Sequence, residues 1–449
     1  MRAPRGGDVA LLVATLAFVL LSVVPLGGYR PWFWIPLSLA AALIFLFSTV
    51  CDLTDRRSAI ETMERLRWPI LLFLAVALWS LVQTMDGLPE MLWHPAYDRI
   101  EAAGRITLDQ DRSSQFAMRL ISYAMIFWIG CRLGRYQTLA NTVLLAVALF
   151  GLAYNAYGLM EFAAGRNEIF GVARRTLEPV AAATIESPNT YAFHAGMCLI
   201  CGTAWLFRSY LAADGKTATF STTVERTLRI ILLLSIPVGL VSIWFAGSRA
   251  GLANSLAGMA ALLALAFLPP LLRKATARVL LVIAIAAPLV LTLAIAQLSG
   301  TTVGTAGLLE RAMMFSTGID MILSGPLAGT GLGTFEIAAE PWKFEELYFY
   351  RWDSAHNIFI EHLVEMGPVV ALMFWVALAL LGRRLSAGFI ERRRDNHYAA
   401  LGLVLFVMAA LHNTIDYPLH RPAVVYLFVL LVGVTWAQSW STAPRRSPA

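Results

Sequence analysis

Charged residues are scarce in this chain: Asp, Glu, Lys and Arg make up 14% of its 449 residues, whereas 58% of them are hydrophobic. Soluble domains carry about 25% charged residues. The shortage excludes a soluble enzyme and a disordered chain. Cysteine is also rare, and four cysteines are too few to staple a chain of this length into a disulfide scaffold. The composition is that of a protein whose surroundings are mainly hydrocarbon.

Apolar runs long enough to cross a bilayer about 30 Å thick recur along the whole sequence. They predict an all-α, polytopic integral membrane protein with about 12 transmembrane helices in a single transmembrane domain, residues 1–449. The first run is too long and too leucine-rich for a signal peptide and lacks a cleavage site, so we expect a retained helix. The predicted spans are roughly 9–26, 32–50, 68–84, 115–131, 138–160, 189–207, 229–246, 251–270, 279–298, 367–382, 398–412 and 422–440.

Basic residues gather in alternate connections between these spans. With both termini in the cytoplasm, the inner segments hold 22 of the 35 Lys and Arg but only 9 of the 29 Asp and Glu. The outer segments then hold the remaining 13 basic and 20 acidic residues. Because Lys and Arg favour the cytoplasmic side of a membrane, this asymmetry predicts an even number of spans and an inner N-terminus. It also explains the net charge of +6 without nucleic acid as a partner.

Three long connections fall on the predicted outer side: residues 85–114, 161–188 and 299–366. Long irregular segments in a compact domain are usually functional. In the third, residues 308–324 have the spacing of an amphipathic helix lying near the membrane interface. A glycine cluster follows at 329–333. A second helix is expected to begin near Asp353 and Ser354 and to end at Gly367.

Two arginines on this outer side are candidates for binding an anion. Arg249 follows Ser248 in the short turn between the seventh and eighth spans, and Arg311 lies on the amphipathic helix. A planar guanidinium offers forked hydrogen bonds to phosphate, so two such residues on one membrane face would suit a pyrophosphate. The ordinary alternatives are an interfacial arginine that reaches lipid headgroups and a solvated residue on a helix face.

The densest polar run lies between Ser354 and Gly367. A histidine titrates near neutral pH and can accept the proton of a hydroxyl, which makes His356 the candidate general base. Asn357, Glu361 and Glu365 lie close by, and the two glutamates share a helix face. The ordinary alternative is a surface histidine. A zinc site made of His356, His362 and Glu365 fits poorly, because histidines six residues apart point to different faces of a helix.

Two more polar segments lie next to predicted spans on the outer side of the membrane. Asp416 lies in the turn between the last two spans, which Pro418 and Pro422 make rigid. It is a candidate for orienting a histidine or an arginine, against the simpler alternative of a tight turn. Asn189 follows Pro188 at the start of the sixth span, where the proline is expected to open the helix.

Two short motifs are assigned no chemistry. Asp109 and Asp111 form a D-x-D of the kind that binds divalent metal in some sugar-transferring enzymes, but the tripeptide is common by chance. Cys198 and Cys201 have the C-x-x-C spacing of redox and zinc motifs. They have no partner pair and lie inside a predicted span, so we interpret them as structural.

Taken together, these motifs resemble the bacterial O-antigen ligase and polymerase superfamily of integral-membrane glycosyltransferases. Their order and spacing fit from about residue 180 to 370, and the number of spans fits over the whole chain. No single motif is decisive. The pieces that carry the resemblance are Ser248-Arg249-Ala250-Gly251, Arg311 before Pro326 to Phe335, and Ala355-His356-Asn357 followed by Glu365-Met366-Gly367.

The resemblance implies a GT-C-like fold in the bacterial inner membrane and an inverting transfer at the periplasmic face that needs neither metal nor cofactor. The donor would be a glycan on undecaprenyl diphosphate, and the acceptor a glycan or a lipid A core. Arg249 and Arg311 would hold the diphosphate, and His356 would deprotonate the acceptor hydroxyl. Ser248, Asn357, Glu361, Glu365, Asn189 and Asp416 are the candidates for supporting these groups.

Other functions stay open. Within the glycosyltransferases, a ligase would transfer the glycan to a lipid A core and a polymerase to another lipid-linked repeat unit. From another class, a transporter or flippase for a lipid-linked glycan would place ionisable residues at mid-membrane. Five of the predicted spans have no charged residue in their interiors, which favours the enzyme. A non-catalytic envelope scaffold is the third alternative.

Overall fold

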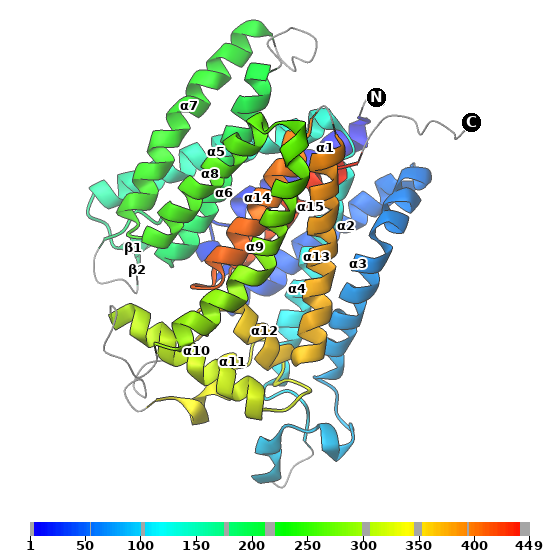
Figure 1. Cartoon of the computed structure of the whole chain (residues 1–449), viewed down its shortest axis with the longest axis vertical. Helices are drawn as coiled ribbons and strands as arrows, with labels where there is room; N and C mark the ends of the chain where they lie inside the picture. The colour runs from blue at the N-terminus through cyan, green and yellow to red at the C-terminus, as the bar shows by residue number, and fades with distance from the viewer. Residues whose placement is uncertain are drawn as a thin grey trace.

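The computed structural model describes residues 4–53, 55–99, 104–174, 179–211, 221–298, 306–344, 353–392 and 395–440. Long apolar helices run side by side through the molecule and form its bulk (Figure 1). Those that coincide with the predicted spans are α1 Gly6–Leu21, α2 Trp34–Leu53, α3 Arg56–Val82, α4 Gln110–Leu133, α5 Gln137–Ala163, α6 Pro188–Leu211, α7 Thr222–Phe245, α8 Arg249–Phe267, α9 Pro270–Ala296, α13 Pro368–Glu391, α14 His397–His412 and α15 Pro422–Gln438.

The remaining elements are short or lie at one end of this bundle. They include α10 Ala306–Ser324, α11 Phe335–Ala339, α12 Ile358–Met366 and a two-stranded hairpin of β1 Glu168–Ile169 and β2 Val172–Ala173. Single 3-10 turns cover Leu26–Gly28, Pro31–Phe33, Glu90–Leu92, Pro95–Arg99, Glu340–Trp342 and Pro418–His420.

Length and composition allow nine helices of the described residues to cross a membrane, while α1, α14 and α15 are shorter apolar helices. The prediction of an all-α, polytopic membrane protein is therefore confirmed. Helix edges differ from the predicted ones because apolar runs mark the bilayer and not the helix ends: α3 begins at Arg56, twelve residues before its predicted span.

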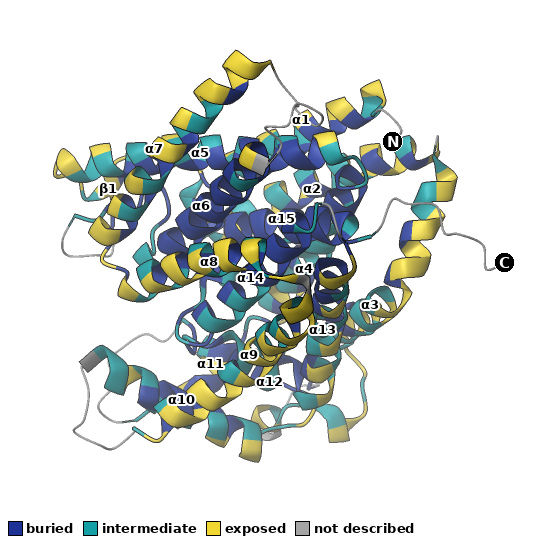
Figure 2. Ribbon diagram, turned by 45° about the horizontal axis from the view of Figure 1, so that its top comes forward, coloured by how far each residue is buried: buried dark blue, intermediate teal, exposed yellow. Residues whose placement is uncertain are grey.

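The centre of the bundle is made by α6, α14 and α15, whose residues are mostly buried in Figure 2. In the most apolar stretch of α6, 94% of the residues are buried, whereas in that of α9 only 17% are. Small residues allow helices to approach closely in the membrane. Gly130 of α4 and Gly433 of α15 face each other, and a Cβ on either glycine would overlap the backbone of the other helix.

A layer of α10, α11, α12 and nearby loops covers one end of the bundle, far from the start of α1 and the end of α15 (Figure 1). It has an apolar core around Phe315, Phe335 and Ile360, and we call it the polar layer because its loops carry the polar residues singled out in the sequence. The predicted amphipathic helix 308–324 lies within α10, and its Phe315 is fully buried. The second predicted helix ends at its C-cap Gly367 as expected, but its predicted start was wrong. It begins at Ile358, because the Asn357 side chain and not that of Asp353 or Ser354 accepts from the first free backbone N–H groups.

Candidate functional site

Three segments far apart in the sequence meet around the Asp416 carboxylate. Its Oδ2 lies 3.9 Å from Nη2 of Arg311, on the first turns of α10. Its Oδ1 lies 4.0 Å from Nδ1 of His356, just before α12. Asn189 at the start of α6 donates a hydrogen bond to Oδ2. The structure thus brings together four of the residues singled out in the sequence, and Asp416, only 3% exposed, is their common neighbour.

His356 does not lie in the helix that was expected to carry it. Its φ of +53° is a left-handed conformation, unusual for a residue with a side chain. The backbone N–H donates to Ser354 Oγ at 3.0 Å. Its ring meets the ring of Tyr417 edge to face, with the centroids 4.7 Å apart. The side chain keeps 26% of its surface exposed, so a ligand can still reach the imidazole.

The surroundings of His356 favour a neutral imidazole. Burial lowers the pKa of His356 below its usual value, the charge of Asp416 opposes this effect, and Arg311 adds to it. Nδ1 is buried and makes no hydrogen bond within the described residues. A neutral ring is the form that can accept a proton from a hydroxyl group.

Arg311 is tethered by backbone oxygens. Its Nε donates to the Ile415 carbonyl at 2.9 Å, and Nη1 donates to the Gly307 carbonyl at 3.0 Å. A guanidinium has five N–H donors, so these bonds leave others for a ligand. The side chain is 29% exposed. The backbone therefore fixes the position of the arginine while some of its N–H donors stay available for a ligand.

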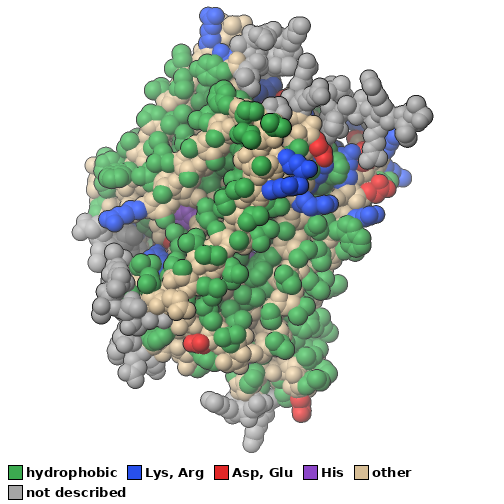
Figure 3. Space-filling view, viewed as in Figure 1, with side chains coloured by type: hydrophobic (Ala, Val, Ile, Leu, Met, Phe, Trp, Pro, Cys, Tyr) green, Lys and Arg blue, Asp and Glu red, His purple; other side chains and the backbone are tan. Residues whose placement is uncertain are grey.

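Arg249 lies at a neighbouring helix start and not in the cluster around Asp416. It is the first residue of α8, with Ser248 as the N-cap that accepts from Gly251 N–H at 3.2 Å. Gly251 packs against Ala192, one turn beyond the start of α6, whose Asn189 binds Asp416. Arg249 is exposed and makes no hydrogen bond or ion pair within the described parts of the chain. In Figure 3 a histidine is visible on the face turned to the viewer, with basic side chains to its left and below it.

The two glutamates of α12 support different loops. Glu361 accepts from Ser354 Oγ and Ala355 N–H, and it faces His420 Nε2 within ion-pair reach. Burial would raise the pKa of Glu361, but the interactions with His420, Ser354 and the Ala355 N–H together lower it below its usual value. Glu361 is therefore ionised.

Glu365 instead accepts from the N–H of Phe335, at 2.9 Å. Burial, reinforced by the charge of Glu361, raises the pKa of Glu365 to about 8. One turn apart on the same helix, the two carboxyl groups therefore hold different protonation states at neutral pH, as environments of this kind dictate.

The glycine cluster is a packing device. Gly329, Gly331 and Gly333 all have positive φ. A Cβ on Gly329 would meet the backbone at Glu365, and one on Gly333 would lie 2.5 Å from the ring of Phe116. Gln83 at the end of α3 donates to the carbonyl oxygens of Ala328 and Glu365, both at 2.9 Å. The loop thus joins α12 to the bundle.

The sequence motifs considered for metal or redox chemistry do not converge. His362 Nδ1 accepts from the Trp375 indole at 3.2 Å, whereas His356 and Glu365 have other partners. Asp109 is the N-cap of α4. Cys198 and Cys201 are buried free thiols. Throughout the residues that the structure describes, no three His, Cys, Asp or Glu side chains are grouped in a way that could hold a metal ion.

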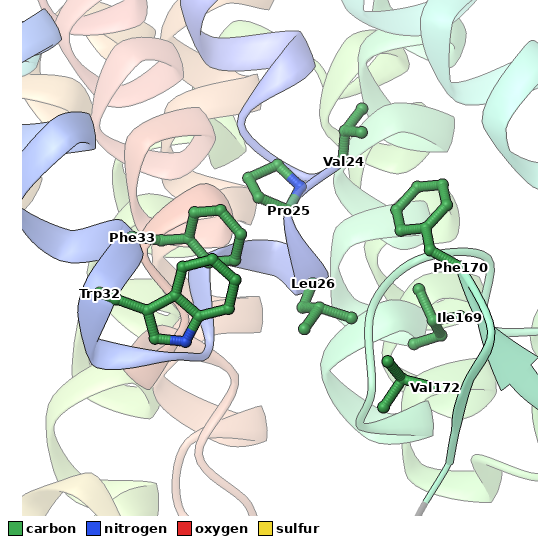
Figure 4. A pocket seen from close by; sticks show the side chains of 8 residues that line it. All are labelled: Val24, Pro25, Leu26, Trp32, Phe33, Ile169, Phe170 and Val172. Atoms are coloured by element: carbon green, nitrogen blue, oxygen red, sulfur yellow. The ribbon is translucent and has the colours of Figure 1, made fainter.

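One hollow on the surface is apolar and lies apart from this cluster. It has a volume of about 360 Å³ between the connection from α1 to α2 and the β1–β2 hairpin (Figure 4). Its walls are Val24, Pro25, Leu26, Trp32, Phe33, Ile169, Phe170 and Val172. Apart from the indole N–H of Trp32 its lining side chains are apolar, and no charged side chain lines it that could bind phosphate.

Sequence reasoning missed three residues that build the site. Tyr417 packs on His356, His420 pairs with Glu361, and Thr292 of α9 accepts from the Asn357 side chain at 2.6 Å. Tyr417 and His420 stand in the same polar run as Asp416, which was a usable signal. Thr292 stands alone in an apolar span, and only the folded structure brings it to Asn357.

In a comparison with known protein families, one segment of the chain matches a family model. Residues 230–376 match a family model described as O-antigen ligase, and this segment contains Arg249, Arg311 and His356 but neither Asn189 nor Asp416. No curated protein matches the sequence. This family implies lipid-linked glycans as substrates and a multi-pass protein of a bacterial inner membrane. The match covers less than half of the chain and, with the helical membrane fold, supports its resemblance to the O-antigen ligase and polymerase superfamily.

Proposed function

We propose that this protein is an inverting, metal-independent glycosyltransferase. It moves a glycan from undecaprenyl diphosphate to an acceptor hydroxyl at the periplasmic face of the inner membrane. The products are ligated O-antigen or a polymerised surface or secreted polysaccharide. One observation supports this above all others: a tethered arginine, a neutral histidine and a buried carboxylate converge from three distant segments, with Arg311 and His356 both partly exposed.

In this proposal His356 is the general base. A proton on Nδ1, toward Asp416, leaves the Nε2 lone pair for the acceptor hydroxyl. The hydroxyl oxygen attacks the anomeric carbon, its proton passes to His356 Nε2, and the bond from that carbon to the phosphate oxygen breaks on the opposite face. The electron pair of that bond leaves with the diphosphate. Asp416 stabilises the imidazolium that forms, and general-base catalysis of this kind contributes about 10²–10⁴-fold.

The arginines serve the leaving group. A diphosphate is weakly basic, so its departure depends on neutralisation of its charge more than on protonation. Arg311, held by two backbone oxygens, offers its free N–H groups to one phosphate. Arg249, exposed at the start of α8, is proposed to bind the other. Arginine stays charged at any working pH, so the pair neutralises the diphosphate without a metal ion.

The position of the cluster suits a donor with a hydrocarbon tail. Arg311 lies on α10, which packs against α9, one of the long apolar helices. A polyprenyl chain lying among the lipids beside α9 would bring its diphosphate sideways to the polar layer. The acceptor would reach His356 from the aqueous side.

The test uses purified protein in lipid nanodiscs with a polyprenyl-diphosphate-linked glycan and an acceptor glycan. In His356→Ala we expect the rate of transfer to fall by about 10²–10⁴-fold while the donor still binds. Normal transfer by this variant would refute the assignment. His94→Ala, which changes an outer histidine away from the cluster, is the control and is expected to transfer normally.

A second experiment separates ligase from polymerase. The gene is deleted in its host, and lipopolysaccharide banding is compared with the amount and length of secreted polysaccharide. A ligase deletion leaves lipopolysaccharide without its long glycan and spares secreted polymer. A polymerase deletion leaves single repeat units in place of long chains.

A further inference from the structure

The carboxylate of Glu361 lies where two parts of the proposed site meet. Oε1 accepts from Ser354 Oγ at 2.6 Å and from Ala355 N–H at 2.7 Å. Oε2 faces Nε2 of His420, which follows Asp416 by four residues. The glutamate is 2% exposed. One buried group on α12 thus holds both the segment before His356 and the turn that carries Asp416.

On the first side, the contacts control the backbone of His356. The His356 N–H donates to Ser354 Oγ at 3.0 Å, and that hydroxyl donates in turn to Glu361. A left-handed conformation at a residue with a side chain is strained and persists only where the surroundings enforce it. Glu361 supplies the end of the hydrogen-bond chain that enforces it here.

On the second side, the contacts control the distance to Asp416. His420 ends the 3-10 turn Pro418–His420, and its own carbonyl accepts a hydrogen bond from Arg119 of α4. Tyr417, between Asp416 and that turn, packs against the His356 ring. Displacing His420 would therefore shift both the Tyr417 ring and the carboxylate that His356 faces.

We propose that Glu361 is a positioning residue that clamps His356 against Asp416 through Ser354 and His420. The inference rests on the proposed role of His356 as the base. Glu361 itself does not touch substrate, because it is buried and both of its oxygens are engaged by protein groups. Geometry matters at this scale, since displacing a catalytic group by about 1 Å can cost 10²-fold in rate.

The test compares kcat, donor KM and donor binding for four variants in nanodiscs. For Glu361→Ala we expect kcat to fall about 10²-fold with donor KM changed less than about threefold. Glu361→Gln keeps an oxygen that accepts from Ser354 and Ala355, so its kcat should be at least about tenfold higher than that of Glu361→Ala. Ser354→Ala breaks the chain at its middle and should lower kcat about tenfold. Because both residues act through one chain, the double variant Ser354→Ala/Glu361→Ala should be no slower than Glu361→Ala.

Glu225→Ala is the matched control, since it removes another buried, ion-paired glutamate at the opposite end of α7 from the site. We expect its kcat to stay near that of the unchanged protein. An unchanged kcat in Glu361→Ala, or losses that multiply in the double variant, would overturn the inference. If Glu361→Ala does not fold, a kcat lowered about tenfold in Ser354→Ala supports the inference, and an unchanged kcat in both Ser354→Ala and Glu361→Gln overturns it. Loss of activity in His356→Ala with none in Glu361→Ala refutes the clamp alone, whereas normal activity in His356→Ala refutes the proposed function.

Discussion

The apolar bundle and the polar layer at its end are built in different ways. In the bundle, helices pack through glycines and aliphatic side chains, as where Gly130 of α4 meets Gly433 of α15. In the polar layer, side chains bond to backbone groups of other segments, as Arg311 does to Ile415 and Glu365 to Phe335. The bundle therefore determines how the chain is inserted and packed in the membrane. The polar layer decides which few groups face one another, so changes in the two regions should affect different properties.

After the loss expected in His356→Ala, the largest expected effect is again on activity and comes from another change in the polar layer. Arg311→Lys keeps the charge but loses the fork of donors, including the Nε that bonds Ile415. We expect transfer to fall about 10²–10³-fold, the cost of removing one preorganised donor to developing charge. Arg229→Lys, at the far end of α7 and bonded to Ser209, should change transfer little. Equal losses in the two variants, at equal amounts of folded protein, would break the distinction between the regions.

The next largest effect is on how the rate of transfer depends on pH. Because the pKa of His356 is lowered, we expect transfer to be constant near neutral pH and to fall about tenfold per pH unit once the pH is below that lowered pKa, where the base becomes protonated. The Asp416 charge opposes the lowering, so Asp416→Asn should slow transfer and move this acidic fall to lower pH. A pH–rate profile of kcat/KM measures both, because this ratio reports the pKa values of the free enzyme. A fall that moves to higher pH in Asp416→Asn would contradict the arrangement.

The smallest effect compares two glycines for stability. Gly331→Ala adds a Cβ at a φ of +96°, against Thr107 in the polar layer. Gly433→Ala adds one between α15 and α4. Overpacking of either kind costs about 1–3 kcal/mol. Thermal unfolding in nanodiscs should show both losses, but only Gly331→Ala should also lower kcat, because its loop supports α12. A lowered kcat in Gly433→Ala alone would reverse the comparison.

How much of this was visible in the sequence also differs between the regions. Hydropathy located the spans, because lipid imposes a length and a composition on every helix that crosses it. It did not give helix ends, so the extension of α3 to Arg56 was missed. In the polar layer, residue types marked His356, Arg311 and Asp416 as candidates. Their convergence depends on contacts between residues 60 apart (His356 and Asp416) and 105 apart (Arg311 and Asp416), and no local pattern encodes such contacts.

The start of α12 shows the same limit on a smaller scale. Ser354 is a good N-cap by type, yet its hydroxyl bonds to Glu361 and leaves the cap to Asn357. That exchange moves His356 out of the helix and into its left-handed conformation. Its consequence for the site follows from a buried carboxylate seven residues away, which a rule about helix starts does not include.

The central claim is that the lipid diphosphate binds between Arg311 of α10 and Arg249 at the start of α8, beside the turn that joins α14 to α15. Its most direct test is photolabelling with a polyprenyl diphosphate that carries a diazirine beside the phosphates, followed by mass spectrometry of the labelled peptides. We predict label on the first turns of α10 around Arg311, at the start of α8 around Arg249 and on residues 413–421, and its loss when unlabelled donor competes. Label confined to the opposite end of the bundle, near the start of α7 or the end of α15, would contradict the account.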